Sequence, residues 1–224
     1  LTPEQIEALR QIDSPTISNA IETFNVRPRV AGYAGYDIRC AFPEFGTMVG
    51  YAVTCTADST TEERPPSRAG WLKLWEALDA APKPAVIVFK DVGQDRLHSC
   101  HMGEVMGTIA KRLGAVGALS DGGLRDVFEI KALGLHYFCP GFVVSHGNPL
   151  ILDAGMEVEI SGMHIKPGDI LHGDVNGILT IPEEVVGKVL DAVEEIRKNE
   201  KAMMDFFNSP DFTLAKLRQR YVSH

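Results

Sequence analysis

A helix that begins with an acid, and an Arg-Asp pair twenty residues further on, are the residues of this chain best suited to chemistry. Glu104 follows Gly103 at the start of a predicted helix, and Arg125 and Asp126 follow a short apolar segment. A helix N-terminus binds a carboxylate through its unpaired N–H groups, and arginine binds one in bidentate fashion. Carboxylates hold a hard divalent cation, usually Mg²⁺. The set therefore suits a small anionic substrate bound beside a metal.

The segment between Glu104 and Arg125 has room for one helix, one strand and one turn. Its pattern predicts a helix over 104–113, a strand over 116–119 and a tight D-G-G turn at 121–123, whose glycines are free to take positive φ. Such a unit returns the chain to its starting point in space. We therefore expect both acids, the arginine and the helix N-terminus to converge on one pocket.

The rest of the chain predicts an α/β fold in a single domain over 1–224. Buried strands are expected at 47–56 and 84–89, the second ending at Lys90 and Asp91, where open α/β sheets place their ligands. Helices are expected within 1–24, over 69–80, from Pro182 onward and over about 210–221, with short strands at 142–145, 155–161, 169–174 and 177–181. The apolar face of the 69–80 helix, formed by Trp71, Leu72, Trp75 and Leu78, is expected to serve the core or an interface.

Composition narrows the class of protein. A formal charge of −8 argues against a nucleic-acid surface, because phosphate binding needs clustered Lys and Arg. The four cysteines are widely spread, which favours reduced and mostly buried thiols. No signal-peptide core and no apolar run of membrane-spanning length is present in the sequence. We expect a soluble cytoplasmic protein.

Each candidate residue also has an ordinary structural explanation. Arg125 could form a surface ion pair, which contributes little to stability. Glu104 could serve only the dipole of its helix, and Asp121 only its turn. The H-S-C-H run at 98–101 contains zinc-ligand residue types, but no second pair of ligands accompanies it.

The spacing resembles the family that contains the regulator of ribonuclease activity A and the 4-hydroxy-4-methyl-2-oxoglutarate/4-carboxy-4-hydroxy-2-oxoadipate aldolases. The aldolases carry an acid, twenty residues and then Arg-Asp, as in Glu104…Arg125-Asp126, here with Glu in place of the more familiar Asp. The likeness extends to G-A-V-G-A-L-S-D-G-G-L-R-D at 114–126, S-P-T-I-S-N-A at 14–20, G-Y-A-V-T at 50–54 and G-D-V-N-G-I-L-T-I-P at 173–182. Two departures, Asn19 and Asn176, stand where the family commonly carries Asp.

The resemblance implies an α/β/α sandwich of the RraA-like type, related to swivelling phosphohistidine domains, with N-terminal helices over about 1–24 and C-terminal helices over 182–222. It also implies homotrimers or homohexamers with active sites between subunits. Asp126 resembles the direct ligand of Mg²⁺ (or Mn²⁺), and Glu104 the acid near the metal's waters. The residues that would bind the pyruvyl part of the substrate are Gly103, Val105, Met106 and Arg125.

The implied function is that of a metal-dependent pyruvate aldolase or 2-keto-acid lyase, which cleaves a 4-hydroxy-2-oxo acid to pyruvate and decarboxylates oxaloacetate. Three alternatives remain open at this point. A Schiff-base aldolase would use Lys90 as its nucleophile. A non-catalytic regulator would use the acidic surface to bind a basic protein segment. A methyltransferase would need a glycine-rich loop after the first strand, and the sequence has none there.

Overall fold

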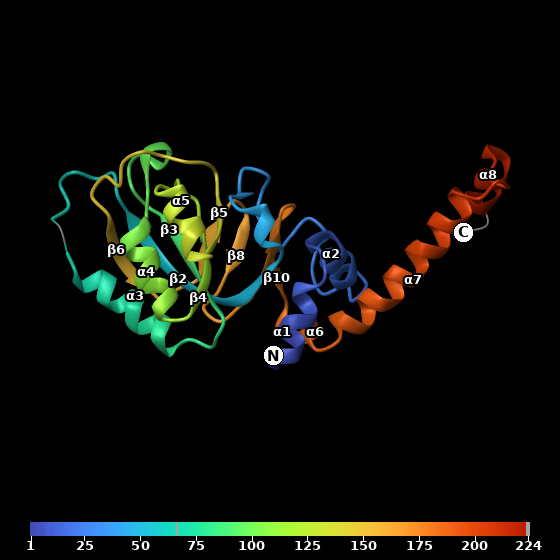
Figure 1. Ribbon diagram of the computed structural model, residues 1–224, viewed down its shortest axis with the longest axis horizontal. Coiled ribbons are helices and arrows are strands. Elements are labelled where there is room, and N and C mark those ends of the chain that lie inside the picture. Colours follow the sequence, from blue (N-terminus) through green and yellow to red (C-terminus); the bar gives the residue numbers. More distant parts are fainter. Residues whose placement is uncertain (66, 223–224) are drawn as a thin grey trace.

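A mixed β-sheet forms the centre of the computed structural model, which describes residues 1–65 and 67–222 (Figure 1). The strands follow the order β1-β5-β4-β3-β2-β9-β10, and β6 also pairs with β2. Their bounds are Arg39–Cys40 (β1), Met48–Asp58 (β2), Ala85–Asp91 (β3), Ala115–Ser120 (β4), His136–Cys139 (β5), Leu150–Ala154 (β6), Ile170–Asp174 (β9) and Gly177–Ile181 (β10). Pro66 and the last two residues of the predicted domain lie outside the described residues.

The four central strands, β2 to β5, run parallel to one another. Side chains of β3 are buried on both faces, as the continuous apolar run predicted. The flanking strands β1, β6, β9 and β10 pair antiparallel. Because β3, β4 and β5 are parallel, the residues that follow them all emerge at the same edge of the sheet.

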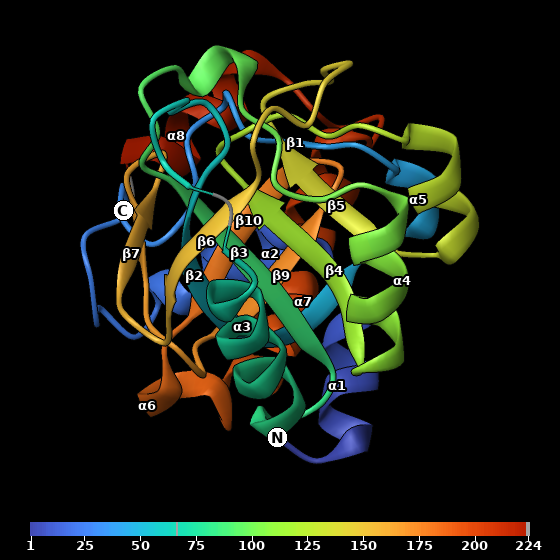
Figure 2. The same ribbon diagram turned by 90° about the vertical axis from the view of Figure 1, so that its left-hand side faces the viewer.

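Three helices cover one face of this sheet: α3 (Ala69–Ala80), α4 (Glu104–Arg112) and α5 (Val127–Leu133). Figure 2 shows α3 and α4 in front of the parallel strands. Their buried side chains share one apolar cluster with β2, β3 and β4. The predicted 69–80 helix is confirmed, and Trp71, Leu74 and Leu78 are its buried apolar side chains, whereas Leu72 is 58% exposed.

The opposite face is covered by a two-stranded hairpin, β7 (Val158–Ile160) and β8 (Met163–Ile165), which packs on β3, β4 and β9. At the β9–β10 end, α1 (Pro3–Arg10), α2 (Ser14–Glu22), α6 (Glu183–Val186) and α7 (Val189–Phe207) form a second apolar cluster. Thr2 and Gln5 complete the capping box expected at the start of α1. The α/β fold of the RraA-like type is thus confirmed.

Three local predictions were wrong. Residues 142–145 form no strand: Phe142 makes one isolated bridge to Leu124, and Val144 is almost fully exposed. A strand was instead missed at β6, which extends the pairing of β2. The helix predicted from Pro182 is interrupted at Gly187 and Lys188, which separate α6 from α7. Beyond its first two turns, α7 projects from the body towards α8 (Leu214–Val222), as Figure 1 shows.

Cysteines behave as the sequence suggested. All four are free thiols; Cys55, Cys100 and Cys139 are buried, and Cys40 is half-buried. Within the described residues, no helix combines the length and the apolar character needed to cross a bilayer.

Candidate active site

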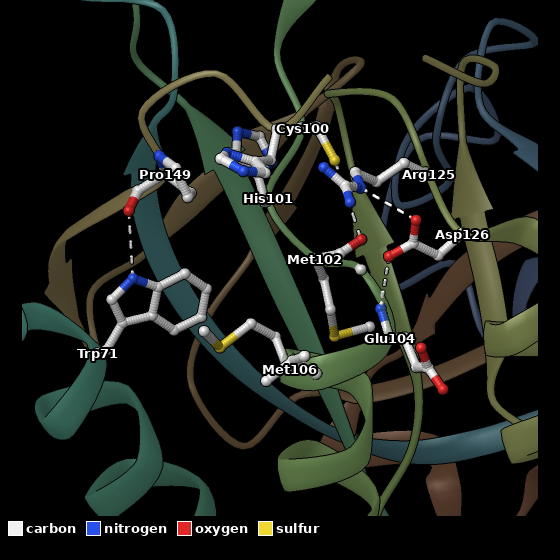
Figure 3. Close-up of a pocket in the computed structure, with 12 residues that line it drawn as sticks. Trp71, Cys100, His101, Met102, Glu104, Met106, Arg125, Asp126 and Pro149 are labelled. Carbon is white, nitrogen blue, oxygen red and sulfur yellow. Dashed lines mark hydrogen bonds and ion pairs between the residues drawn. The ribbon is translucent and has the colours of Figure 1, made fainter. Parts of the chain in front are cut away.

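The unit α4–β4–α5 returns to its starting point and closes a polar cluster at the carboxyl edge of the sheet (Figure 3). The backbone N–H of Glu104 donates to Oδ2 of Asp126 at 3.0 Å, and Nε of Arg125 donates to Oδ1 of the same carboxylate at 3.1 Å. These residues line a cavity of about 310 Å³. The convergence expected of the helix start and the Arg-Asp pair is therefore present.

Asp126 holds a backbone conformation that is rare for a residue with a side chain. Its φ is 57° and its ψ 48°, in the left-handed region. It precedes α5 at the N-cap position but does not cap that helix. Its carboxylate turns back and accepts the first N–H of α4 instead. Left-handed non-glycine residues held in place by their surroundings concentrate at functional sites.

Gly103 makes this arrangement possible. It is the N-cap of α4 and brings no side-chain acceptor of its own. A Cβ atom at this position would overlap Oδ2 of Asp126. The glycine thus leaves space for a carboxylate from another element to approach the start of the helix.

The ion pair between Arg125 and Asp126 is partly exposed to solvent. The side chains of Arg125 and Asp126 are 28% and 29% exposed. The hydrogen bond from the Glu104 N–H, with the Arg125 guanidinium and nearby His146, holds the pKa of Asp126 below its usual value despite partial burial. Asp126 is therefore an anion at neutral pH.

The remaining predicted residues lie along the first turn of α4. Glu104 and Val105 are exposed at the rim of the cavity, and Met106 is half-buried within it. The N–H groups of Val105 and Met106 belong to the first turn of a helix and have no intrahelical partner. Both residues line the cavity together with Gly103, so these donors lie where a carboxylate ligand would need them.

Sequence reasoning missed one wall of the cavity. Trp71 of α3, Met102, His146 and Pro149 line it, together with Cys100 and His101. Trp71 Nε1 donates to the Pro149 carbonyl at 3.3 Å, and its ring stacks on Trp75 with centroids 5.4 Å apart. The tryptophan was expected to serve only the core or an interface. No spacing links Trp71, His146 or Pro149 to the Arg-Asp pair, so the sequence carried no signal for them.

Two predicted candidates lie outside this cavity. Lys90 donates to Asp121 Oδ2 at 2.8 Å, and that carboxylate also accepts the Asp91 N–H. Asp121 faces a separate cavity of about 200 Å³ beside Arg96. The glycines after Asp121 do not take positive φ. They provide space instead, since a side chain at Gly122 would overlap Ser99 and the His101 ring.

A buried polar chain supports the cavity wall from behind. His101 Nε2 lies 2.8 Å from Asp91 Oδ2, and its Nδ1 lies 2.9 Å from Ser120 Oγ. All three residues are buried. His98, by contrast, is exposed and pairs with Asp95. The two histidines of the H-S-C-H run therefore face different carboxylates.

Two acids, Glu104 and Asp126, line the cavity. Within the described residues no three side chains of His, Cys, Asp or Glu gather as a ligand cluster. Mg²⁺ retains several waters and is commonly held by one or two carboxylates plus the substrate. Asp126 and Glu104 are the acids in the cavity that fit this mode.

An α/β fold with an acid and an Arg-Asp pair at the carboxyl edge of its sheet defines the class of this protein. The model of the RraA-like family (Aldolase/RraA) matches residues 14–180, and the chain belongs to that family. Among the solved structures it resembles is one described as a novel cellulase from microbes of the gut ecosystem, with 24% identity, coverage of 90% of this chain and 87% of that one, and a TM-score of 0.76. Another is RraAS2 of Streptomyces coelicolor, described as an unusual member of the RNase ES inhibitor RraA family, with 20% identity, coverage of 91% and 97%, and a TM-score of 0.65. At these identities the structures share the fold alone.

Related sequences have closer identity over shorter spans. Protein MJ0644 of Methanocaldococcus jannaschii is 32% identical over 136 residues, which are 60% of this chain and 65% of that protein. Protein DlpA of Legionella pneumophila is 30% identical over 64% of this chain and 23% of its own length. A Halalkalibacterium halodurans protein provisionally named as a 4-hydroxy-4-methyl-2-oxoglutarate aldolase is 30% identical over 42% of this chain and 45% of its own. The match spans less than two thirds of each relative.

Proposed function

We propose that this chain is a divalent-metal-dependent carbon–carbon lyase that releases pyruvate from a 4-hydroxy-2-oxo acid and also decarboxylates oxaloacetate. The observation that carries the proposal is the meeting of Arg125, the Asp126 carboxylate and the N-terminus of α4 in one cavity. Membership of the RraA-like family and the aldolase name of one relative support a lyase of this kind.

Binding of the 2-oxo acid would use fixed donors. The substrate carboxylate is placed at the free N–H groups of Val105 and Met106, where the dipole of α4 favours an anion. Arg125 adds a permanent positive charge beside the ketone oxygen. Both groups are held before the substrate arrives, α4 by its backbone and Arg125 by its bond to Asp126, so little reorganisation accompanies the reaction.

Asp126 is the residue proposed to hold Mg²⁺ or Mn²⁺ directly, with Glu104 contacting the waters of the ion. When bound, such an ion acts as a Lewis acid towards the carbonyl oxygen of a 2-oxo acid. The lowered pKa of Asp126 keeps it anionic and available as a ligand across the neutral range. Glu104 is exposed at the rim, where it can exchange protons with water.

The cleavage itself is a retro-aldol step. The C4 hydroxyl gives up its proton towards Glu104 through water, the C3–C4 bond breaks, and its electron pair moves to the C2 carbonyl as an enolate. C4 leaves as a carbonyl compound, and C3 then takes up a proton to give pyruvate. Decarboxylation of oxaloacetate yields the same enolate with loss of CO₂. Arg125 and the α4 N-terminus would stabilise the negative charge that both reactions develop.

We also propose that the active form is a homotrimer or homohexamer with its sites between subunits. The cavity opens where Glu104 and Val105 are exposed, so a neighbouring subunit could close it and add further acids. A non-catalytic regulator is the second candidate. Its support is the formal charge of −8 together with the fold shared with RraAS2, described as a member of an RNase ES inhibitor family.

The test is pyruvate release from oxaloacetate and from 4-hydroxy-4-methyl-2-oxoglutarate, measured with Mg²⁺, with Mn²⁺ and after EDTA. The lyase predicts pyruvate that appears with metal and disappears with chelator. Turnover that survives EDTA and is trapped by borohydride would point to a Schiff base on Lys90. No pyruvate from these or any other 4-hydroxy-2-oxo acid, in a folded oligomer, would favour the regulator.

A further inference from the structure

The cavity has a charged end and an apolar end, and the apolar end was not foreseen from the sequence. From this division we infer that the preferred substrate is a 2-oxo acid with a single carboxylate, whose C4 carbon carries an apolar aryl or branched alkyl group. The inference rests on the proposed lyase function and adds the chemical class of its substrate.

Trp71 forms the far wall of the cavity. Figure 3 shows its indole opposite Arg125 and Asp126, with Met102 and Met106 between them. The indole is fixed on two sides, by its bond to the Pro149 carbonyl and by stacking on Trp75. Because its only N–H donor is already used, Trp71 offers the ligand an apolar ring and no hydrogen bond.

Methionine side chains continue this apolar surface towards the charged end. Met102 is fully buried and Met106 half-buried, and both line the cavity. Thioethers are flexible and polarisable, so they fit aryl and alkyl groups of several shapes. A substrate with its carboxylate at the α4 N-terminus would direct its C4 group along Met106 towards Trp71.

Charge argues against a second carboxylate at the Trp71 end. Among the cavity-lining residues that the structure describes, Arg125 is the one permanent cation, and it already pairs with Asp126. His101 is buried against Asp91, and exposed His146 lies close enough to Asp126 to influence its pKa. Glu104 and Asp126 would repel another anion. Among the described residues of one subunit, a distal carboxylate would therefore lose water beside Trp71 without gaining a positive partner.

The experiment compares 4-hydroxy-2-oxo-4-phenylbutanoate with 4-hydroxy-4-methyl-2-oxoglutarate, by kcat/KM for pyruvate release with Mg²⁺. We expect the aryl substrate to be preferred by about tenfold or more, the scale on which apolar pockets discriminate. Trp71→Leu should lower kcat/KM for the aryl substrate about tenfold, mainly through KM, and change the diacid less than about threefold. Met106→Lys should shift the preference towards the diacid by adding a cation. Leu72→Ala, on the exposed side of the same helix, is the matched control and should change neither.

A binding measurement separates this inference from the proposed function. Calorimetric titration of phenylpyruvate and of 2-oxoglutarate, with Mg²⁺, needs no turnover. Tighter binding of phenylpyruvate, weakened by Trp71→Leu and not by Leu72→Ala, supports the apolar end even if no pyruvate is ever released. Preference for the diacid in both assays overturns the inference while leaving the lyase intact. Equal losses for both ligands in Trp71→Leu, or no binding of either by wild type, also overturn it.

Discussion

Asp126 has two separable roles, and replacing it with Asn or with Ala distinguishes them. In its structural role, the Asp126 carboxylate accepts a hydrogen bond from the first N–H of α4. In its proposed catalytic role, the same negatively charged carboxylate binds the metal. Asn keeps an acceptor oxygen and tolerates left-handed backbone, but lacks the charge. Ala keeps none of these properties. We expect both variants to lose metal-dependent pyruvate release, and only Asp126→Ala to lose substantial stability.

The expected loss for Asp126→Ala follows from the geometry. Removing the acceptor at a helix N-terminus costs about 1 kcal/mol. Placing Ala at φ 57° costs about 1 kcal/mol more. The sum of about 2 kcal/mol corresponds to a fall in Tm of about 4–8 °C for a chain of this size. For Asp126→Asn, the loss is that of a partly exposed ion pair with Arg125, below about 1 kcal/mol.

Urea denaturation at one fixed protein concentration measures both stabilities, because an oligomer's stability depends on concentration. Pyruvate release, measured in Mg²⁺ and in EDTA, tests whether Asp126 binds the metal. Equal stability of the Ala and Asn variants would refute the structural role of the Asp126 carboxylate as acceptor of the first N–H of α4. Metal-dependent turnover in Asp126→Asn at the wild-type rate would refute its assignment as the metal ligand.

Two further predictions concern the start of α4 and a histidine at the start of β5. Gly103→Ala should displace the Asp126 carboxylate, abolish pyruvate release and cost about 1 kcal/mol in urea denaturation, because the new Cβ would overlap Oδ2. Gly187→Ala, whose Cβ would meet open space at φ −69°, is the matched control and should be neutral or slightly stabilising. The second prediction is a pH dependence of stability. Burial lowers the pKa of His136 from 6.5 to about 4, so the unfolded chain binds a proton in this range while the folded chain does not. Stability should fall as pH drops from 6.5 towards 4, and denaturation of His136→Phe should show a smaller fall; an unchanged slope would contradict this. Asp126 contributes to the pH dependence only at lower pH, because its pKa is already below 3.8.

The parts of the site that the sequence predicted lie within one short stretch of chain. Helix α4, strand β4 and the start of α5 follow one another between Glu104 and Asp126, so local periodicity and glycine positions were enough to place them together. The carboxyl-edge location followed equally from the buried run of β3. The left-handed backbone of Asp126 and the pairing of Lys90 with Asp121 could not be predicted, because tertiary contacts determine them.

The apolar wall was unpredictable for a physical reason. Trp71 comes from α3, and Pro149 from the loop before β6, and the pairing of β6 with β2 brings that loop beside the helix. Strand β6 was itself missed, because short apolar segments carry no period that separates strand from loop. Likewise, the break between α6 and α7 interrupts a continuous apolar pattern at Gly187, which tertiary packing determines and periodicity does not.

The charged end and the apolar end of the cavity are built from different parts of the chain. The charged end depends on residues within one contiguous unit, and Gly103, Arg125 and Asp126 constrain one another through backbone geometry. The wall of the apolar end is formed by Trp71 of α3 and by Pro149 of a distant loop, which lie outside that unit. Two chains that share the Arg-Asp unit can therefore share a reaction and differ in the group carried on C4. The acid and Arg-Asp spacing consequently argues for the chemistry, whereas the residue at position 71 argues for the substrate.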